Sequence, residues 1–342
     1  MTEPLVECVP NFSEGKNQDI IDKITLEITN TNGATLLDVD SGADFNRTVV
    51  TVVGEPNAVL DAVVAASKKA IELIDMSHHK GEHARMGAVD VVPFIPIRNM
   101  TISDCVKLSE KYAERMANDK NLAVYLYAES ARDPERKLLP NIRKGEYEGF
   151  AEKLKFPEWK PDYGPSIFNE KTGVTATGAR QILIAYNVNL NTNNKSIANE
   201  IAGKIRTSGV LKKDNQGNNI LDEFGKKVRI HGKFKDLQGA GWMYDSETAQ
   251  VSMNLLDYTN TGMHEVTNEI SELAKTYGLE FTAGEIVGLV PLEAILEAGK
   301  YYNNGKDDTD KILIEKAIQG MKLDVLDEFK PEDRIIELSS GL

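Results

Sequence analysis

The sequence predicts an α/β protein of the α+β kind, with two subdomains that each follow a split βαβ order. Three observations lead to this fold class. The chain has 342 residues, which is enough for two domains. Apolar residues recur with the period of strands in some segments and of helices in others. The order strand, helix, strand, strand, helix, strand occurs twice. We therefore expect mixed sheets, each with its helices mainly on one face.

The first half of the chain contains one such set of elements followed by a further helix and strand. Ile20, Ile24 and Ile28 recur every four positions and predict one face of a helix. Pro56 suits the first turn of a second helix, and Ser103 is a candidate cap for a third. The expected strands are 5–10, 34–40, 47–53, 89–98 and 122–128, and the expected helices are 20–28, 56–74 and 103–116.

Residues 130–173 read as an irregular, charged segment with a small basic cluster. The cluster consists of Arg132, Arg136, Lys137, Arg143 and Lys144. A hinge is expected near residues 174–180, where threonines and a glycine interrupt any periodic pattern.

The second half repeats the order of the first. Its expected strands are 181–189, 239–244, 250–256 and 281–287, and its helices are 193–205, 266–277, 291–302 and 308–320. Residues 208–233 are polar and predict an exposed excursion. We place the N-terminal subdomain at 1–180, the C-terminal subdomain at 181–330 and a C-terminal tail at 331–342.

Composition excludes several classes of protein. A formal net charge of −13 argues against nucleic-acid binding, and an anionic ligand would need a local basic site. No apolar run approaches the roughly 20 residues that span a membrane, and the N-terminus lacks the features of a signal peptide. Cys8 and Cys105 form neither a disulfide framework nor a zinc motif, which favours a cytoplasmic location.

Residues 75–90 carry the strongest candidate chemistry. Three of the five histidines in the chain, His78, His79 and His83, fall within six positions. Gly81 and Gly87 flank His83 and allow a sharp loop. Because histidine has an ordinary pKa of about 6.5, such an imidazole can take up and return a proton near neutral pH. The alternative is a solvated surface histidine, but clustering favours His83 as a catalytic base.

A metal site in this loop is not expected. His79 and His83 stand four apart, the spacing of two zinc ligands on a helix. Gly81 lies between them and disfavours a helix, and the remaining histidines suggest no further ligands.

Two other features are candidates for binding. Asp40 ends a predicted strand, where a carboxylate can orient a histidine, and Arg47 begins the next, where it can grip a substrate carboxylate. An ordinary surface ion pair is the equal alternative. The segment 163–168, together with Gly173, offers aromatic rings, a hydroxyl and close backbone approach to a flat ligand. From the residues alone, a structural loop is the favoured reading of that segment.

Longer sequence motifs occur at residues 6–15, 36–40, 46–48, 79–88, 124–127 and 287–291. Together they resemble those of the formiminotransferase family. The resemblance covers nearly the whole chain, and the motifs are long and specific. The chain departs from the family in its longer excursion at 208–233. It also stops at Leu342, where animal relatives continue into a cyclodeaminase domain, so we expect that second activity to be absent.

The resemblance implies two ferredoxin-like subdomains, a homodimer, and tetrahydrofolate bound as co-substrate in a cleft between the subdomains. The catalytic histidine of the family matches His83. Its folate-contacting segment matches Gly164, Pro165, Ser166, Ile167, Phe168, Asn169, Glu170, Lys171, Thr172 and Gly173. This match favours a ligand-binding role for that loop over a purely structural one.

The implied activity is transfer of the formimino group from N-formimidoyl-L-glutamate to N5 of tetrahydrofolate, a step of histidine degradation and one-carbon metabolism. Asp40 is then the candidate that orients His83, and Arg47 the candidate that holds a glutamate carboxylate. Lys80, Arg85, Arg143 and Lys144 are candidates for local positive potential. Two alternatives stay open: a glutamate formyltransferase that uses 5-formyltetrahydrofolate, and a folate-binding protein without turnover.

Overall fold

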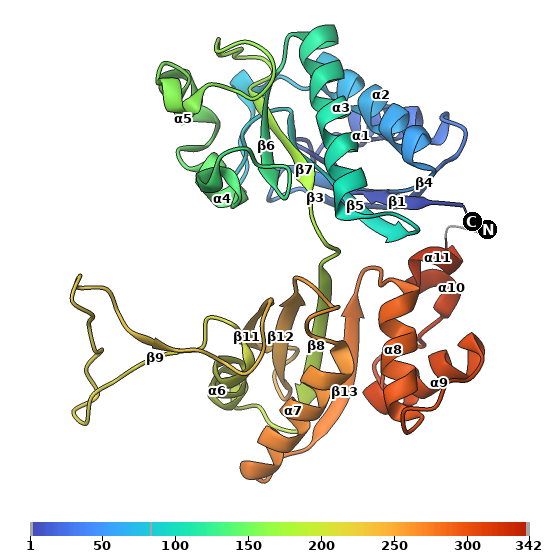
Figure 1. The fold of residues 1–342 in the computed structure, drawn as a ribbon, viewed down its shortest axis with the longest axis vertical. Coiled ribbons are helices and arrows are strands. Elements are labelled where there is room, and N and C mark those ends of the chain that lie inside the picture. The colour runs from blue at the N-terminus through green and yellow to red at the C-terminus, as the bar shows by residue number, and fades with distance from the viewer. Residues whose placement is uncertain (1–2, 83, 340–342) are drawn as a thin grey trace. The chain divides into compact units, whose positions relative to one another are not determined.

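The computed structural model describes residues 3–82 and 84–339, and the chain divides into two compact units, 1–181 and 182–342 (Figure 1). Unit 1 contains β1 (Leu5–Cys8), β2 (Asn11–Phe12), α1 (Gln18–Thr29), β3 (Ala34–Gly42), β4 (Arg47–Gly54), α2 (Pro56–Leu73), η1 (Met76–His78), β5 (Val89–Arg98), α3 (Ile102–Lys120), β6 (Ala123–Ala128), η2 (Pro134–Arg136), α4 (Leu139–Arg143), α5 (Glu146–Lys153), η3 (Pro157–Trp159) and β7 (Val174–Ala179). Unit 2 contains β8 (Ile184–Leu190), α6 (Lys195–Ile205), β9 (Val210–Leu211), β10 (Arg229–Ile230), β11 (Leu237–Met243), β12 (Ala249–Leu255), α7 (Met263–Thr276), β13 (Phe281–Val287), α8 (Leu292–Tyr302), α9 (Asp310–Met321), α10 (Pro331–Arg334) and α11 (Ile336–Ser339).

Both units contain the same βαββαβ arrangement, which confirms the predicted fold class. In unit 2 the strand order is β11, β12, β8, β13, so the first strand of the set lies between the third and the fourth. Unit 1 repeats this order with β3, β4, β1 and β5, and short β2 also pairs with β4 and β5. Every pairing in the sheet of unit 2 is antiparallel. In unit 1 the sheet is mixed, because β7 runs parallel to both β5 and β6.

The strand β7 corrects the expected hinge at 174–180. All six of its residues are buried, and it lies between β5 and β6. The hydroxyl groups of the threonines that interrupt the apolar pattern form hydrogen bonds inside the sheet. Thr175 donates its hydroxyl hydrogen to the carbonyl of Val89, and Thr177 donates to that of Val92, each at 2.7 Å. Polar residues in a strand therefore look like a linker when their partners lie on a distant segment.

Unit 1 packs a hydrophobic core on each face of its sheet. Along β6, Val124 and Leu126 join the larger core with α1, α2 and α3, whereas Tyr125 and Tyr127 join a smaller core on the opposite face. Side chains of a strand alternate between faces in this way. The smaller core includes residues from α4 and α5. These helices have five and eight residues, too few for a clear helical period, so the sequence pattern of 130–173 looked irregular.

The long helices begin and end at residues that satisfy their terminal groups. Helix α3 begins after Thr101, which forms a capping box with Asp104, so Ser103 does not cap it. Asn17 caps α1 through its side chain. Helix α2 has Pro56 in its first turn, as expected, and leads through η1 into the histidine loop. The buried face of α3 includes Cys105, which confirms that cysteine as a core residue.

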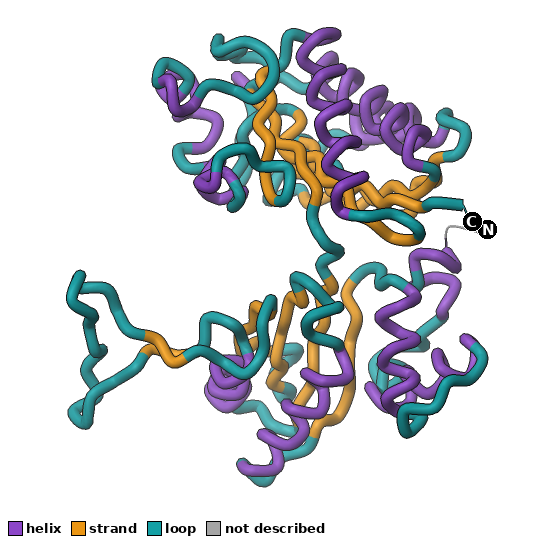
Figure 2. Tube along the Cα trace, in the orientation of Figure 1, coloured by secondary structure: helices purple, strands orange, loops and turns teal. Residues whose placement is uncertain are grey.

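The excursion of unit 2 forms an extended arm, visible at β9 in Figure 1 and drawn mostly as loop in Figure 2. Its two strands β9 and β10 pair in antiparallel fashion. Asp214 and Asp222 each accept two backbone hydrogen bonds, which fix two tight turns near the tip. Most of its residues are exposed, as predicted. None of the helices within residues 3–82 and 84–339 is long and apolar enough to cross a membrane.

Candidate active site

The loop that precedes β5 is anchored on the turn between β3 and β4. His83, the predicted catalytic residue, lies outside the described residues. On one side of it, the Asn46 amide donates to the carbonyl of Lys80 at 2.9 Å, and Glu82 N donates to the Asp44 carbonyl at 3.3 Å. A Cβ on Gly81 would lie 2.3 Å from the Phe45 carbonyl oxygen. Only glycine fits there, and its missing side chain lets the backbone of the loop pack directly against the turn.

The ring of His79 is held at both nitrogens. Nε2 lies 2.9 Å from the backbone oxygen of Asn46, and Nδ1 accepts a hydrogen bond from Nε of Arg85 at 3.3 Å. Because the arginine can only donate, Nδ1 carries no proton, and Nε2–H donates to Asn46. Burial lowers the pKa of His79. His79 is therefore fixed as a neutral ring and is poorly placed to carry a proton during a reaction.

Arg85 is neutralised by two carboxylates from α5. Its terminal nitrogens donate to Glu146 at 3.0 Å and to Glu148 at 2.6 Å. The side chain is mostly buried, and its hydrogen bond lowers the pKa of Glu148. Arg85 therefore fixes the histidine loop on α5 and has no excess charge to offer, contrary to the expectation that it supplies positive potential.

The segment 164–173 lies directly beside the histidine loop. Gly87 and Gly173 form an antiparallel bridge, flanked by hydrogen bonds from Ala88 N to the Thr172 carbonyl and from Val174 N to the Met86 carbonyl. A Cβ on Gly173 would lie 2.2 Å from the Met86 oxygen, and one on Gly87 would lie 2.4 Å from the Val174 oxygen. Glycines at both positions thus allow two segments, far apart in sequence, to meet backbone to backbone.

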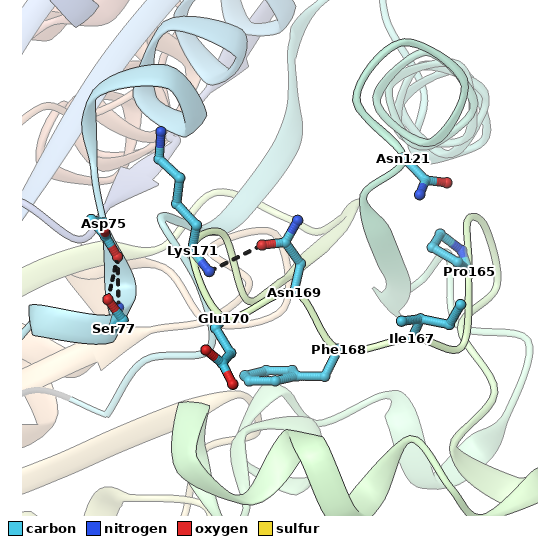
Figure 3. A pocket seen from close by; sticks show the side chains of 9 residues that line it. All are labelled: Asp75, Ser77, Asn121, Pro165, Ile167, Phe168, Asn169, Glu170 and Lys171. Carbon is cyan, nitrogen blue, oxygen red and sulfur yellow. Dashed lines mark hydrogen bonds between the residues drawn. The ribbon is translucent and has the colours of Figure 1, made fainter.

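Two pockets lie near this junction, one lined in part by Lys171 and the other in part by Arg85. The first, here called the Phe168 pocket, has a volume of about 560 Å³ (Figure 3). Its walls are Asp75, Ser77, Asn121, Pro165, Ile167, Phe168, Asn169, Glu170 and Lys171. The second, the His79 pocket, has about 650 Å³. It is lined by Met76, Ser77, His79, Lys80, Gly81, Arg85, Gly145, Glu146, Tyr147 and Glu148. The pockets share Ser77, and the rings of Tyr147 and Phe168 meet between them with centroids 5.2 Å apart.

The predicted segment is divided between lining and support. Six of its ten residues line the Phe168 pocket. The backbone of Gly164 has a positive φ of 81° and packs against the Leu122 carbonyl, while the buried Thr172 and Gly173 form the junction. Asn169 Oδ1 accepts from the amides of Lys171 and Thr172, which fixes the turn that presents Phe168. The segment therefore combines a rigid base with an exposed apolar rim, Ile167.

The predicted pair Asp40 and Arg47 lies at one end of the β3–β4 hairpin. Asp40 is exposed and opposite Val49, and Arg47 is half-buried at the start of β4. Burial lowers the pKa of Arg47, and Asp90 counteracts this more strongly than Asp40 does. The basic cluster expected at 130–144 does not gather, because Arg132 pairs with Glu110, Arg136 with Asp162 and Arg143 with Asp90.

Three kinds of residue in this site were not predicted from the sequence. Asn46 holds the histidine loop, Glu146 and Glu148 hold Arg85, and Asp90 is a buried carboxylate within β5. Asp90 had a signal: a charge inside the apolar run 89–95 needs a buried partner. The other three looked like ordinary loop and surface residues.

Comparison with known proteins identifies the family. Residues 5–180 match the formiminotransferase domain, N-terminal subdomain, and residues 185–339 match the formiminotransferase domain. The mouse (Mus musculus) formimidoyltransferase-cyclodeaminase is 45% identical over 97% of this chain, and the chain spans 59% of that protein. Glutamate formimidoyltransferases of Streptococcus pyogenes and Thermoplasma acidophilum are each 39% identical, over 92% and 89% of this chain and 99% and 94% of their own. This chain belongs to the formiminotransferase family.

Proposed function

We propose that this chain transfers the formimino group of N-formimidoyl-L-glutamate to N5 of tetrahydrofolate, giving 5-formimidoyltetrahydrofolate and L-glutamate. Family membership supports this reaction, as do the names of the bacterial and archaeal relatives whose lengths the chain nearly covers. The observation that supports the proposal is the junction of the histidine loop with segment 164–173 at Gly87 and Gly173, because it joins the loop to which we assign the proton carrier to the segment to which we assign the folate.

The reaction needs one group that first accepts and then donates a proton. N5 of tetrahydrofolate attacks the formimino carbon and loses its proton as the new bond forms. The bond between that carbon and the glutamate nitrogen then breaks, and the nitrogen gains a proton as it leaves. A histidine near its ordinary pKa serves both steps. We assign this role to His83, since both ring nitrogens of His79 are engaged in holding the loop.

The remaining groups bind and orient. We assign folate contact to Gly164–Gly173, where Phe168 and Ile167 offer apolar surface and Asn169 and Glu170 offer polar groups. Arg47 holds a carboxylate of the glutamate-bearing substrate, and Asp40 orients His83. In this proposal no metal takes part. A homodimer and a cytoplasmic location complete the proposal and rest on the family resemblance and on cysteine usage.

The test is an assay of the purified chain with each of two one-carbon donors. The proposal expects 5-formimidoyltetrahydrofolate to form from N-formimidoyl-L-glutamate and tetrahydrofolate. It expects much slower formation of N-formylglutamate from 5-formyltetrahydrofolate and glutamate. Faster turnover with the formyl donor would assign the chain to folate salvage instead. Tight tetrahydrofolate binding without turnover of either donor would make it a folate-binding protein.

A further inference from the structure

Asn46, in the turn between β3 and β4, forms hydrogen bonds to two distant segments of unit 1. Its side-chain oxygen Oδ1 accepts from the backbone N–H of Gly15 at 3.0 Å, and its amide nitrogen Nδ2 donates to the Lys80 carbonyl at 2.9 Å. Its backbone oxygen accepts from Nε2 of His79 at 2.9 Å. Asn46 itself is buried. It therefore links the segment before α1 and the histidine loop (residues 75–88) to the same turn.

Two glycines allow both segments to approach this turn closely. A Cβ on Gly15 would lie 2.4 Å from the Gly42 oxygen and 2.5 Å from the backbone nitrogen of Arg47. A Cβ on Gly81 would lie 2.9 Å from the Cβ of Asn46. Each segment thus packs its backbone against the turn, and the side chain of Asn46 supplies a hydrogen bond to each of them.

Asparagine meets two requirements of this position. Its φ is +48°, in the left-handed region that glycine, asparagine and aspartate tolerate best. Its amide donates to a carbonyl at one end and accepts from an N–H at the other. Glycine suits the backbone but has neither group, and aspartate has the same shape but no hydrogen to donate. Substitution by these two residues therefore removes different parts of the link.

Both groups proposed to act on the glutamate-bearing substrate are attached to this link. Arg47, assigned to a substrate carboxylate, follows Asn46 directly, and His83, assigned as the base, comes three residues after Lys80. A misplacement of about 1 Å between reacting groups can lower a rate by roughly 100-fold. Resting on the proposed function, we propose that Asn46 is a positioning residue, which holds the loop of His83 at a fixed distance from Arg47 without itself contacting the substrate.

The kinetic test is a double-mutant cycle between Asn46 and His83. Asn46→Gly should lower kcat by at least about tenfold, the effect of a misplaced base. In the His83→Ala background the same substitution should lower kcat no further, because no base is left to position. Tetrahydrofolate binding, measured by calorimetry, should be kept. A purely structural role would lower kcat by the same factor in both backgrounds, and that result would overturn the inference.

Asn46→Asp isolates the hydrogen bond to Lys80. It keeps the acceptor for Gly15 N but places a carboxylate oxygen against the Lys80 carbonyl, so kcat should again fall by at least about tenfold. Asn304→Gly is the matched control, because Asn304 lies in unit 2 and also has a left-handed backbone, with φ +57°. It should keep wild-type turnover. Normal turnover by both Asn46 variants would show that the inference is wrong.

Hydrogen exchange measures the same link without any turnover. Backbone amides of residues 75–88 should exchange faster in Asn46→Gly and Asn46→Asp than in the wild type or Asn304→Gly, because the loop opens more readily when its bond to Asn46 is lost. Unchanged exchange in both Asn46 variants would contradict the inference. A wild-type chain that shows this dependence on Asn46 but forms no 5-formimidoyltetrahydrofolate would overturn the proposed function and leave the link between turn and loop standing.

Discussion

Replacing Gly173 with alanine tests how segment 164–173 is joined to the histidine loop. Gly173 has φ +64°, in the left-handed region that alanine disfavours by roughly 1–2 kcal/mol. The added Cβ would also lie 2.2 Å from the Met86 oxygen and 2.6 Å from the Gly87 Cα, so the two segments must separate. Separation breaks the hydrogen bonds on either side of the bridge, from Ala88 N and from Val174 N.

The expected loss of stability is the sum of the backbone strain and the broken hydrogen bonds. Two backbone hydrogen bonds contribute about 1 kcal/mol each, which with the backbone strain gives a loss of roughly 3–4 kcal/mol in the unfolding free energy of unit 1. Two further variants separate the terms. At Gly145, φ is +89° and the nearest atom to a Cβ lies 3.6 Å away, so Gly145→Ala costs the strain alone. Gly87→Ala, which has no left-handed strain, should cost about the hydrogen bonds, roughly 2 kcal/mol.

The assay is denaturant unfolding followed by tryptophan fluorescence. The chain has two tryptophans, Trp159 in unit 1 and Trp242 in unit 2, so Trp242→Phe leaves a reporter for unit 1 alone. Each glycine variant is made in that background. Gly173→Ala should destabilise unit 1 more than Gly145→Ala does, and an equal or smaller effect would contradict this prediction. That result would mean that the two segments can separate at the junction without loss of stability, so the junction does not hold them together.

Three other predictions concern the site itself. Arg47→Ala should raise the KM for N-formimidoyl-L-glutamate with a smaller change in kcat, and an equal fall in kcat would contradict a binding role. His79→Gln should flatten the dependence of unit 1 stability on pH. Burial lowers the pKa of His79 in the folded chain. The folded wild type therefore loses stability as the pH falls below the unfolded-state pKa of about 6.5. An unchanged pH profile in the variant would argue against a buried neutral ring. Chelator treatment should leave turnover unchanged because both nitrogens of His79 already have protein partners, and activity restored by zinc would contradict this.

The sequence alone was enough to predict the elements that depend on local periodicity. The two βαββαβ sets, the excursion at 208–233 and the core position of Cys105 follow from spacing and composition. The strand β7 could not be recognised, because its threonines are satisfied only by carbonyls of β5, more than 80 residues away. Short helices α4 and α5 were missed because eight residues or fewer show no stable period.

The candidate site divides in a similar way. Glycine and histidine motifs locate the loop at 75–90, and the family resemblance locates segment 164–173. The residues that hold these parts together carry no local signal. Asn46 donates to the carbonyl of Lys80, which lies 34 residues later in the chain. Glu146 and Glu148 bind Arg85 across some 60 residues. Such contacts depend on tertiary packing, which no single segment encodes.

The most direct test of the proposed reaction is a single-turnover measurement of 5-formimidoyltetrahydrofolate formation by the wild-type chain and by His83→Ala. His78→Ala and His79→Gln serve as controls from the same loop. We predict a loss of about 100-fold or more for His83→Ala, the scale expected for removing a general base. Tetrahydrofolate binding should be largely kept, and both controls should show milder losses. Normal turnover by His83→Ala, together with a large loss in His79→Gln, would show that the proton is carried by the other imidazole and would contradict the assignment of His83.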